Sequence, residues 1–129
     1  MPKPEIELTE AEWTIIKAVW DHEPCAAPDI QARLFKRTRW TYSTVRTLMD
    51  RMVGKKLLTA EKVRNFTLYR SAVTRSQAQR GELLYALRHA FNGALTPMVQ
   101  CILDAHKLSA DELEKLETII RAKKKSAKK

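Results

Sequence analysis

The stretch from Trp40 to Val53 constrains the fold of this chain most, because it joins a helical apolar stripe to a polar face of uncommon composition. Apolar side chains recur there at i, i+3, i+4 and i+7, the spacing that places them on one side of a helix. These side chains are Val45, Leu48, Met49 and Met52. Thr41 precedes the stripe and is the predicted N-cap. We therefore predict a helix here, with one side packed in a core.

The opposite side of that helix carries short hydroxyls and long guanidinium groups. Hydroxyls suit phosphate oxygens, and guanidinium groups suit the edges of bases. This composition favours a helix that enters a groove of DNA, with base-reading side chains at Ser43, Thr44, Arg46 and Thr47. The first-turn N–H groups beside Thr41 would then hold a phosphate. An ordinary amphipathic helix with a solvated basic face is the alternative that this stretch alone leaves open.

Charge is distributed unevenly along the 129 residues. Residues 1–32 hold two basic and seven acidic side chains. Residues 33–70 hold eleven basic side chains against Asp50 and Glu61, a net charge of +9. A positive field concentrated around the proposed reading helix is typical of a surface that binds a polyanion.

The elements before the reading helix complete a helix-turn-helix. Thr9 and Glu12 form a capping box, so a first helix is expected from about Glu10 to Trp20. A turn at 21–24 leads to a second helix near 28–35, which has a proline at a tolerated early position. A basic connector at 36–39 then precedes the reading helix. Helix, helix, turn, helix is the order in which the last helix lies in the major groove.

A two-stranded hairpin is predicted directly after the reading helix. Residues 57–63 and 66–70 are rich in β-branched and aromatic side chains, and Arg64-Asn65 between them suits a tight turn. A ribbon in this position makes a winged helix. Basic side chains of the ribbon and of the end of the reading helix are predicted to contact phosphates, namely Arg51, Lys55, Lys62 and Arg64. Solvated hairpin charges are the alternative for the last two.

Three further helices are predicted after the hairpin. Capping boxes at Thr74/Gln77 and Ser109/Glu112 begin the first and third, and the second covers about 97–105. Their apolar side chains include Leu84, Leu87, Phe91, Leu113, Leu116 and Ile120. A domain of about 72 residues cannot cover all of these, so we expect them to form a homodimer interface. The alternative is that the helices fold back on their own wing domain.

These patterns predict a mainly α chain in three parts. Residues 1–72 form a winged helix-turn-helix with a two-stranded wing, residues 73–122 form a C-terminal helical dimerisation region, and residues 123–129 form a disordered basic tail. No apolar run approaches the length of a membrane span, and nothing suggests a signal peptide, which favours a cytoplasmic protein without membrane insertion. Cys25 and Cys101 are isolated, so buried, reduced thiols are expected, and no cofactor or metal site is predicted.

Several of these segments resemble the BlaI/MecI/CopY family of bacterial penicillinase repressors. The likeness lies in Leu8 to Trp13, Val19-Trp20, Trp40 to Leu48, Tyr69-Arg70 and Phe91-Asn92-Gly93, and it covers nearly the whole chain in order. The resemblance implies a homodimeric winged-helix repressor that binds a palindromic operator in double-stranded DNA. It also implies dimerisation through the C-terminal helices, and release by a membrane sensor's signal that leads to proteolysis in that region.

The chain departs from the family pattern at four places. Cys101-Ile102 stands where better known members have the Asn-Phe bond that is cleaved, which puts cleavage at that site in doubt. The paired Cys-x-Cys motifs of copper-responsive members are absent, so copper sensing by that mechanism is not expected. Tyr42 replaces a common proline at the start of the reading helix, and Lys56 replaces a common turn glycine.

Two other classes of function compete with a sequence-specific repressor. A nucleic-acid enzyme needs clustered carboxylates or an activated nucleophile, and the basic segment offers only Asp50 and Glu61. A winged-helix module for protein contacts would need less positive charge on its reading face. A regulator of the same family induced by a ligand or a metal is a further alternative. The operator, the regulated genes and the inducing signal do not follow from the sequence.

Overall fold

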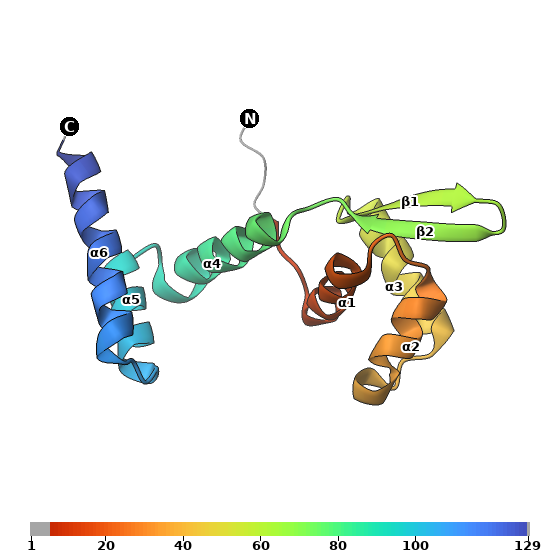
Figure 1. Ribbon diagram of the computed structural model, residues 1–129, viewed down its shortest axis with the longest axis horizontal. Coiled ribbons are helices and arrows are strands. Elements are labelled where there is room, and N and C mark those ends of the chain that lie inside the picture. Colours follow the sequence, from red (N-terminus) through yellow and green to blue (C-terminus); the bar gives the residue numbers. More distant parts are fainter. Residues whose placement is uncertain (1–5, 129) are drawn as a thin grey trace. The chain divides into compact units, whose positions relative to one another are not determined.

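The computed structural model describes residues 6–128 of the chain. The elements in order are α1 (Glu10–His22), α2 (Ala27–Thr38), α3 (Tyr42–Gly54), β1 (Leu58–Val63), β2 (Phe66–Ser71), α4 (Arg75–Phe91), α5 (Leu95–Ala105) and α6 (Ala110–Ala127) (Figure 1). The chain divides after Tyr85 into two compact units, here called the N-terminal and C-terminal units. The predicted mainly α class, with a winged helix-turn-helix and a two-stranded wing, is confirmed.

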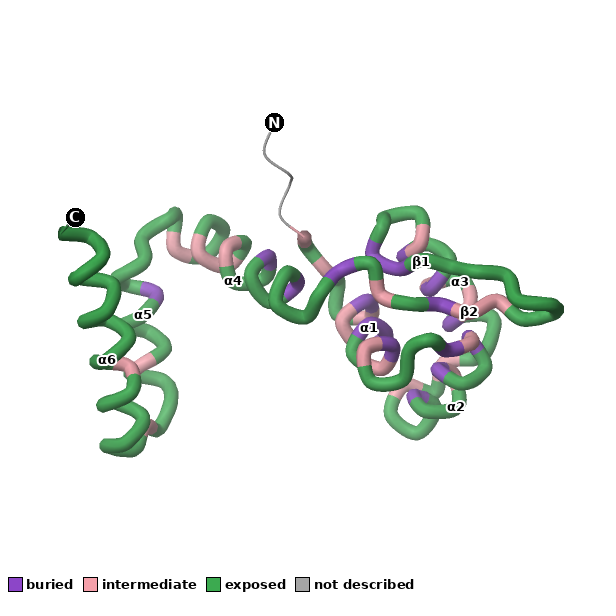
Figure 2. Tube along the Cα trace, turned by 45° about the horizontal axis from the view of Figure 1, so that its top comes forward, coloured by how far each residue is buried: buried purple, intermediate pink, exposed green. Residues whose placement is uncertain are grey.

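The core of the N-terminal unit lies between α1, α2, α3 and the base of the hairpin (Figure 2). Nine of its large side chains are almost completely buried, namely Ile15, Ile16, Val19, Ile30, Val45, Met49, Met52, Leu58 and Tyr69. The two strands are antiparallel, and Val63 pairs with Phe66 at the tip while Leu58 pairs with Ser71 at the base. Burial of this set positions α3, because three of the nine come from its apolar stripe.

A short stretch before α2 extends the pairing of the wing. Cys25 N donates to Tyr69 O at 3.1 Å, and Tyr69 N donates to Cys25 O at 2.8 Å. The Glu23 carboxylate accepts from the backbone N of Ser71 at 2.9 Å. Strand β2 is thereby fixed to the segment between α1 and α2. These hydrogen bonds hold the base of the wing against the helical core.

Two helices are longer than the sequence predicts. Helix α1 continues to His22, and α2 continues to Thr38, so most of the expected connector is helical. The Thr38 hydroxyl donates to Leu34 O at 2.9 Å, and Arg39 ends the helix in the left-handed conformation with φ of 60°. Arg39 adopts this conformation although it is not glycine, and its N–H donates to Phe35 O, which satisfies one of the last carbonyls.

An ion pair joins α1 to the end of α3. Lys55 Nζ donates to Glu12 Oε2 at 2.6 Å, and the side chain of Glu12 is only 7% exposed. Glu12 also accepts from Thr9 N at 2.9 Å in the predicted capping box, and Glu12 N donates to Thr9 Oγ1 at 3.2 Å. Burial would raise the pKa of the Glu12 carboxyl, but the Lys55 and Thr9 hydrogen bonds outweigh it and hold the pKa below its ordinary value.

This pair predicts a loss of stability in acid. Because the pKa of Glu12 is lowered in the folded state, its contribution is fully present above the ordinary pKa and disappears as the pH falls through the folded value. Glu12→Gln should therefore lower the free energy of unfolding at pH 7 by about 1–3 kcal/mol. The difference from the original chain should shrink below about pH 4. Urea unfolding across this pH range measures both effects.

The matched control for that prediction is Asp111→Asn. Asp111 pairs with Lys115 at 3.4 Å, but both side chains are largely exposed. Exposed pairs contribute little, so its effect should stay within about 0.5 kcal/mol. Equal losses for the two variants, or a Glu12→Gln difference that persists in acid, would contradict the assignment to the buried pair.

The N-terminal unit reaches beyond the expected boundary at residue 72. Trp20 Nε1 donates to Val73 O at 3.0 Å, and Ala78 on α4 is buried. A Cβ placed on Gly81 would lie 1.8 Å from Ile6 O, so the chain before α1 packs directly on the α4 backbone there. The first half of α4 therefore belongs to the N-terminal unit, because small residues let the two segments approach closely.

The C-terminal unit holds the end of α4 with α5 and α6. Helix α4 ends at Asn92-Gly93, as expected, with positive φ at both residues and Gly93 N donating to Leu87 O at 2.9 Å. Helix α6 continues through Ala127, so the expectation of a disordered tail over 123–129 is wrong for its described residues. Lysine and alanine are strong helix formers, and positive charge is favourable at a helix C-terminus.

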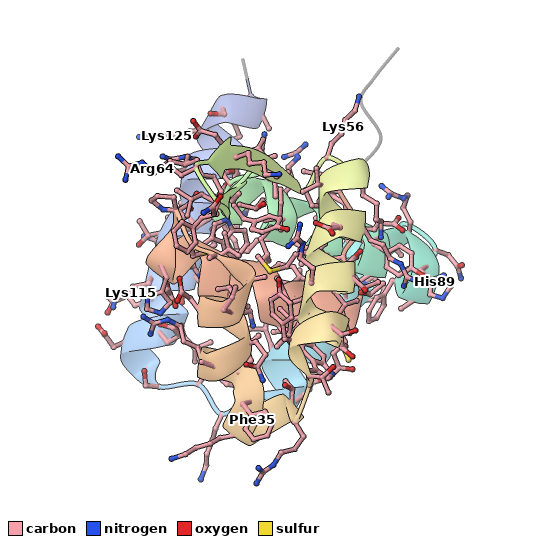
Figure 3. The ribbon with its side chains drawn as sticks, turned by 90° about the vertical axis from the view of Figure 1, so that its right-hand side faces the viewer. Phe35, Lys56, Arg64, His89, Lys115 and Lys125 are labelled. Carbon is pink, nitrogen blue, oxygen red and sulfur yellow. The ribbon has the colours of Figure 1, made fainter. Side chains whose placement is uncertain are left out.

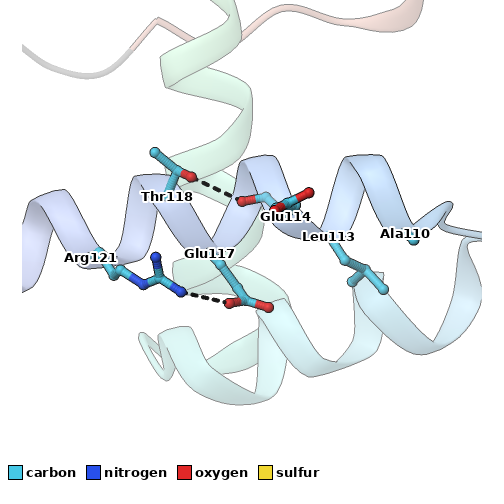
Figure 4. A pocket seen from close by; sticks show the side chains of 6 residues that line it. All are labelled: Ala110, Leu113, Glu114, Glu117, Thr118 and Arg121. Atoms are coloured by element: carbon cyan, nitrogen blue, oxygen red, sulfur yellow. Dashed lines mark hydrogen bonds and ion pairs between the residues drawn. The ribbon is translucent and has the colours of Figure 1, made fainter.

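One face of α6 borders a shallow surface pocket (Figure 4). Its lining residues are Ala110, Leu113, Glu114, Glu117, Thr118 and Arg121. Arg121 donates to Glu117 at 3.2 Å along this face. Leu113 in this lining is 43% exposed and Ile120 on the same helix is 54% exposed, so this unit leaves part of its apolar stripe uncovered.

Candidate nucleic-acid interface

Helix α3 presents its polar face to solvent as the sequence predicts. Val45, Met49 and Met52 are fully buried, and Leu48 is half-buried against the core. The candidate base-reading hydroxyls of Ser43, Thr44 and Thr47 are exposed. The apolar stripe thus fixes the rotation of α3 about its own axis, and the polar face follows from it.

Thr41 caps α3 as predicted. Its Oγ1 accepts from Thr44 N at 3.2 Å and donates to the Thr44 hydroxyl at 3.1 Å. Asp50 is the one acidic side chain of α3, and the first turn has none. The positive end of the helix dipole is therefore not neutralised by a carboxylate there, which favours an anion such as a phosphate.

Arg46 lies in a hydrogen-bond network on the surface of α3. Its Nε donates to Asp50 Oδ2 at 3.1 Å and to Oδ1 at 3.3 Å, and its Nη1 donates to the Tyr42 hydroxyl at 3.3 Å. The three residues follow one another at a spacing of four, which places them on one side of the helix. The Tyr42 hydroxyl and then Asp50 raise the pKa of the Arg46 guanidinium further above its ordinary value.

The network continues into the hydrophobic core through the wing. The Tyr69 hydroxyl donates to Asp50 Oδ1 at 2.7 Å, while the Tyr69 side chain is completely buried. Burial, and then the Asp50 carboxylate, raise the pKa of the Tyr69 hydroxyl above its ordinary value, so it stays a donor. The sequence alone does not indicate these contacts of Tyr42 and Tyr69. The spacing of Tyr42, Arg46 and Asp50 is visible in the sequence, but the contact of Tyr69 is not.

The candidate phosphate-binding side chains fall into two groups. Arg51, Lys62 and Arg64 are exposed, and Arg64 points outward from the hairpin tip with φ of 57° (Figure 3). Lys55 instead donates to Glu12, although its side chain is 50% exposed.

Lys56, outside the predicted set, points away from the end of α3 (Figure 3). Phe66, which the sequence did not mark, is 64% exposed at the tip of the wing.

The cysteines differ in their surroundings. Cys25 is buried, and burial followed by the charges of Asp29 and Glu23 raises the pKa of its thiol to about 11. Cys101 is exposed, so the expectation of two buried thiols is wrong for this residue.

Within residues 6–128, no three His, Cys, Asp or Glu side chains gather where they could hold a metal ion. None of the helices described is both long and apolar enough to cross a membrane.

Comparison with known proteins identifies a family of DNA-binding repressors, in agreement with the winged-helix fold. Residues 8–122 match the family model described as penicillinase repressor. The chain belongs to this family. Members of the penicillinase repressor family are transcriptional repressors, so the chain is a DNA-binding regulator and not an enzyme. The resemblance to the BlaI/MecI/CopY repressors is thereby confirmed.

Individual relatives of this family match over nearly their whole length. The methicillin resistance regulatory protein MecI of Staphylococcus aureus is 25% identical over 117 residues, covering 91% of this chain and 95% of the relative. The penicillinase repressor of Bacillus licheniformis is 25% identical over 122 residues, 95% of each chain. The solution structure of the DNA-binding domain of the repressor BlaI has a TM-score of 0.50 and 23% identity over 60% of this chain and 93% of that domain. This likeness shows the winged-helix fold.

Proposed function

We propose that the protein represses transcription by binding a palindromic operator as a homodimer. The observation that carries this proposal is the exposed face of α3, where hydroxyls and a guanidinium group stand beside a basic wing. The segment 33–70 that contains both carries a net charge of +9. A helix of this kind supplies base contacts, and the surrounding positive charge supplies affinity for the phosphate backbone.

Base readout is assigned to the first half of α3. Arg46 suits a guanine, since a guanidinium group can donate two hydrogen bonds to its O6 and N7 atoms. Thr44, Thr47 and Ser43 suit a thymine methyl group or a phosphate oxygen. Recognition helices meet base edges near their N-terminal end, where these four residues lie.

Phosphate contacts are assigned to both ends of α3 and to the wing. Thr41 and the first-turn N–H groups face one phosphate, and Arg51, Lys62 and Arg64 face others. Lys55 joins them only in part, because a phosphate has to compete with the Glu12 carboxylate for its ammonium group. Its contribution should therefore be the smallest of the basic side chains.

Salt dependence tests this assignment. Replacing Arg51, Lys62 or Arg64 with alanine should weaken binding to all DNA sequences similarly, because phosphates carry no sequence information. Each should make the slope of log affinity against log salt concentration shallower by about one unit. Lys55→Ala should change the slope less. Gel-shift titrations at several salt concentrations measure both quantities, with Lys115→Ala on α6 as the control.

Unchanged slopes for the three exposed side chains would show that this face does not meet DNA. The proposal would then fail in favour of a winged helix that binds another protein. A shallower slope for Lys115→Ala would place the contact on α6 instead. A smaller effect of Lys55 than of Arg51 would support the competing role of the Glu12 pair.

Dimerisation and release complete the proposed function. We assign dimer contacts to the apolar side chains of the last three helices, namely Leu84, Leu87, Phe91, Leu113, Leu116 and Ile120. The first three and Leu116 are partly covered within one chain, whereas Leu113 and Ile120 are exposed. Release in the cytoplasm by a membrane sensor's signal, such as proteolysis in this region, would separate the two reading helices from each other. The bond between Cys101 and Ile102 lies in α5, and both residues are exposed.

A further inference from the structure

The reading face of α3 contains a carboxylate that DNA binding by itself does not explain. Asp50 is 53% exposed on the helix that carries Arg46. An unpaired acid in this position would repel the phosphate backbone. Asp50 is instead paired within the protein, because its two oxygens accept hydrogen bonds from Arg46 Nε and the Tyr69 hydroxyl.

These contacts form a chain from the core to the reading face. Tyr69 is fixed in the core by complete burial of its side chain and by two backbone hydrogen bonds to Cys25. Its hydroxyl holds Asp50 at 2.7 Å, and Asp50 holds the Nε edge of Arg46 at 3.1 Å. The position of a half-buried arginine on the reading face is thus determined by a buried residue of the wing. Surface ion pairs on a single helix have no such support.

The network also determines which part of the guanidinium group remains for a ligand. Nε is occupied by Asp50, and Nη1 uses one of its hydrogens for the Tyr42 hydroxyl. Within the described residues, the Nη2 hydrogens have no protein acceptor at hydrogen-bond distance, and one hydrogen of Nη1 also remains. Nη2 and the remaining Nη1 hydrogen are therefore available as donors, and two donors from one guanidinium group match the O6 and N7 acceptors of a guanine.

We propose that Asp50 and Tyr69 are positioning residues that hold Arg46 in the conformation in which its Nη1 and Nη2 groups read a guanine. The inference rests on the proposed function, since it assigns the specificity of the same face. Fixing Arg46 before binding removes the entropy cost of immobilising a long side chain in the complex. The pairing also neutralises Asp50, so that the carboxylate does not oppose the phosphates.

The test uses the full chain and a DNA site selected from randomised duplexes by the original protein. Tyr69→Phe removes one hydroxyl and keeps the ring in the core. It should lower affinity for the selected site by about threefold to tenfold, the usual effect of one hydrogen bond, and leave affinity for random DNA unchanged. Asp50→Asn should lower specific affinity as well, but raise affinity for random DNA, because it removes a negative charge. Both variants should lose the preference of the protein for guanine at one position of the site.

Glu117→Gln is the matched control. Glu117 pairs with Arg121 at 3.2 Å with the same spacing of four residues, but on α6. Loss of this pair should change neither affinity. Thermal unfolding of each variant shows whether it is folded, and Asp50→Asn carries the test if Tyr69→Phe does not fold.

Combination with Arg46→Ala separates positioning from other roles. In the Arg46→Ala background, Tyr69→Phe should have no further effect on the selected site, because the residue that it positions is absent. An additive loss of affinity, or equal losses of affinity on selected and random DNA, would show that the network has only a structural role. A loss for Asp50→Asn that persists without Arg46 would show that Asp50 reads a base itself. If the original chain selects no DNA sequence, the proposed function itself is contradicted, and not only the positioning role of Asp50 and Tyr69.

Discussion

Replacing Arg46 with alanine should lower affinity for the operator by on the order of tenfold to a hundredfold, while affinity for random DNA falls much less. Two parallel hydrogen bonds to a guanine are lost only on the specific site, whereas the remaining basic side chains still meet phosphates on any DNA. Gel-shift titrations on the selected site and on random DNA of the same length measure the two losses.

The control for Arg46→Ala is Arg51→Ala on the same helix. Arg51 lies on the exposed side near the end of α3 and is assigned to a phosphate. Its removal should weaken both DNAs by similar factors. An equal loss on both DNAs for Arg46→Ala would move Arg46 to the phosphate class, and the base-reading role would then have to come from Thr44, Thr47 or Ser43.

The sequence predicted those features that depend on neighbours within one turn of helix. The stripe of α3 and the caps at Thr9, Thr41 and Thr74 are patterns of three or four residues, and the structure confirms each of them. The order of helices and the hairpin follow from the change of period after Lys56. These features are local, so they can be read without knowing what packs against them.

Contacts between distant residues could not be predicted in this way. Lys55 suited a phosphate by its charge and position, but Glu12 lies 43 residues earlier in the chain and already accepts from it. The Tyr69 hydroxyl reaches Asp50 across 19 residues. In both cases the partner is brought close by burial of side chains on other elements, and no spacing in the sequence expresses that.

Contacts made by small residues and by the backbone leave no apolar pattern in the sequence. Residue 72 marks the end of the wing in the sequence, yet Val73, Ala78 and Gly81 lie in the first compact unit. Small residues gave no apolar signal, although their small size is what admits Ile6 against α4. The C-terminal extent of α6 does not follow from the sequence pattern, because residues 123–127 have no apolar stripe and extend the helix through propensity alone.

A second large effect is expected when the C-terminal unit is removed. A chain that ends at Tyr85 keeps the whole first compact unit, including the contact of Gly81 with Ile6, and should remain folded. It should run as a monomer and bind the operator about a hundredfold to ten-thousandfold more weakly, because the second half-site contact is effectively intramolecular only when the two reading helices are tethered. Analytical ultracentrifugation and gel-shift titration measure the two properties.

A full-length variant separates dimerisation from the mere presence of the C-terminal unit. Ile120 is 54% exposed on α6, so completing its burial in a partner should recover about half of the roughly 1.5–3 kcal/mol that full burial of such a side chain is worth. Ile120→Arg places a charge in the proposed interface, so it should reproduce the monomer and the weak binding of the shortened chain. Ser126→Arg adds the same charge to the same helix away from the stripe, and should leave both properties unchanged. If Ile120→Arg still dimerises and binds the operator tightly, the uncovered stripe of α6 serves another contact, and the spacing of the reading helices has to be set elsewhere in the chain.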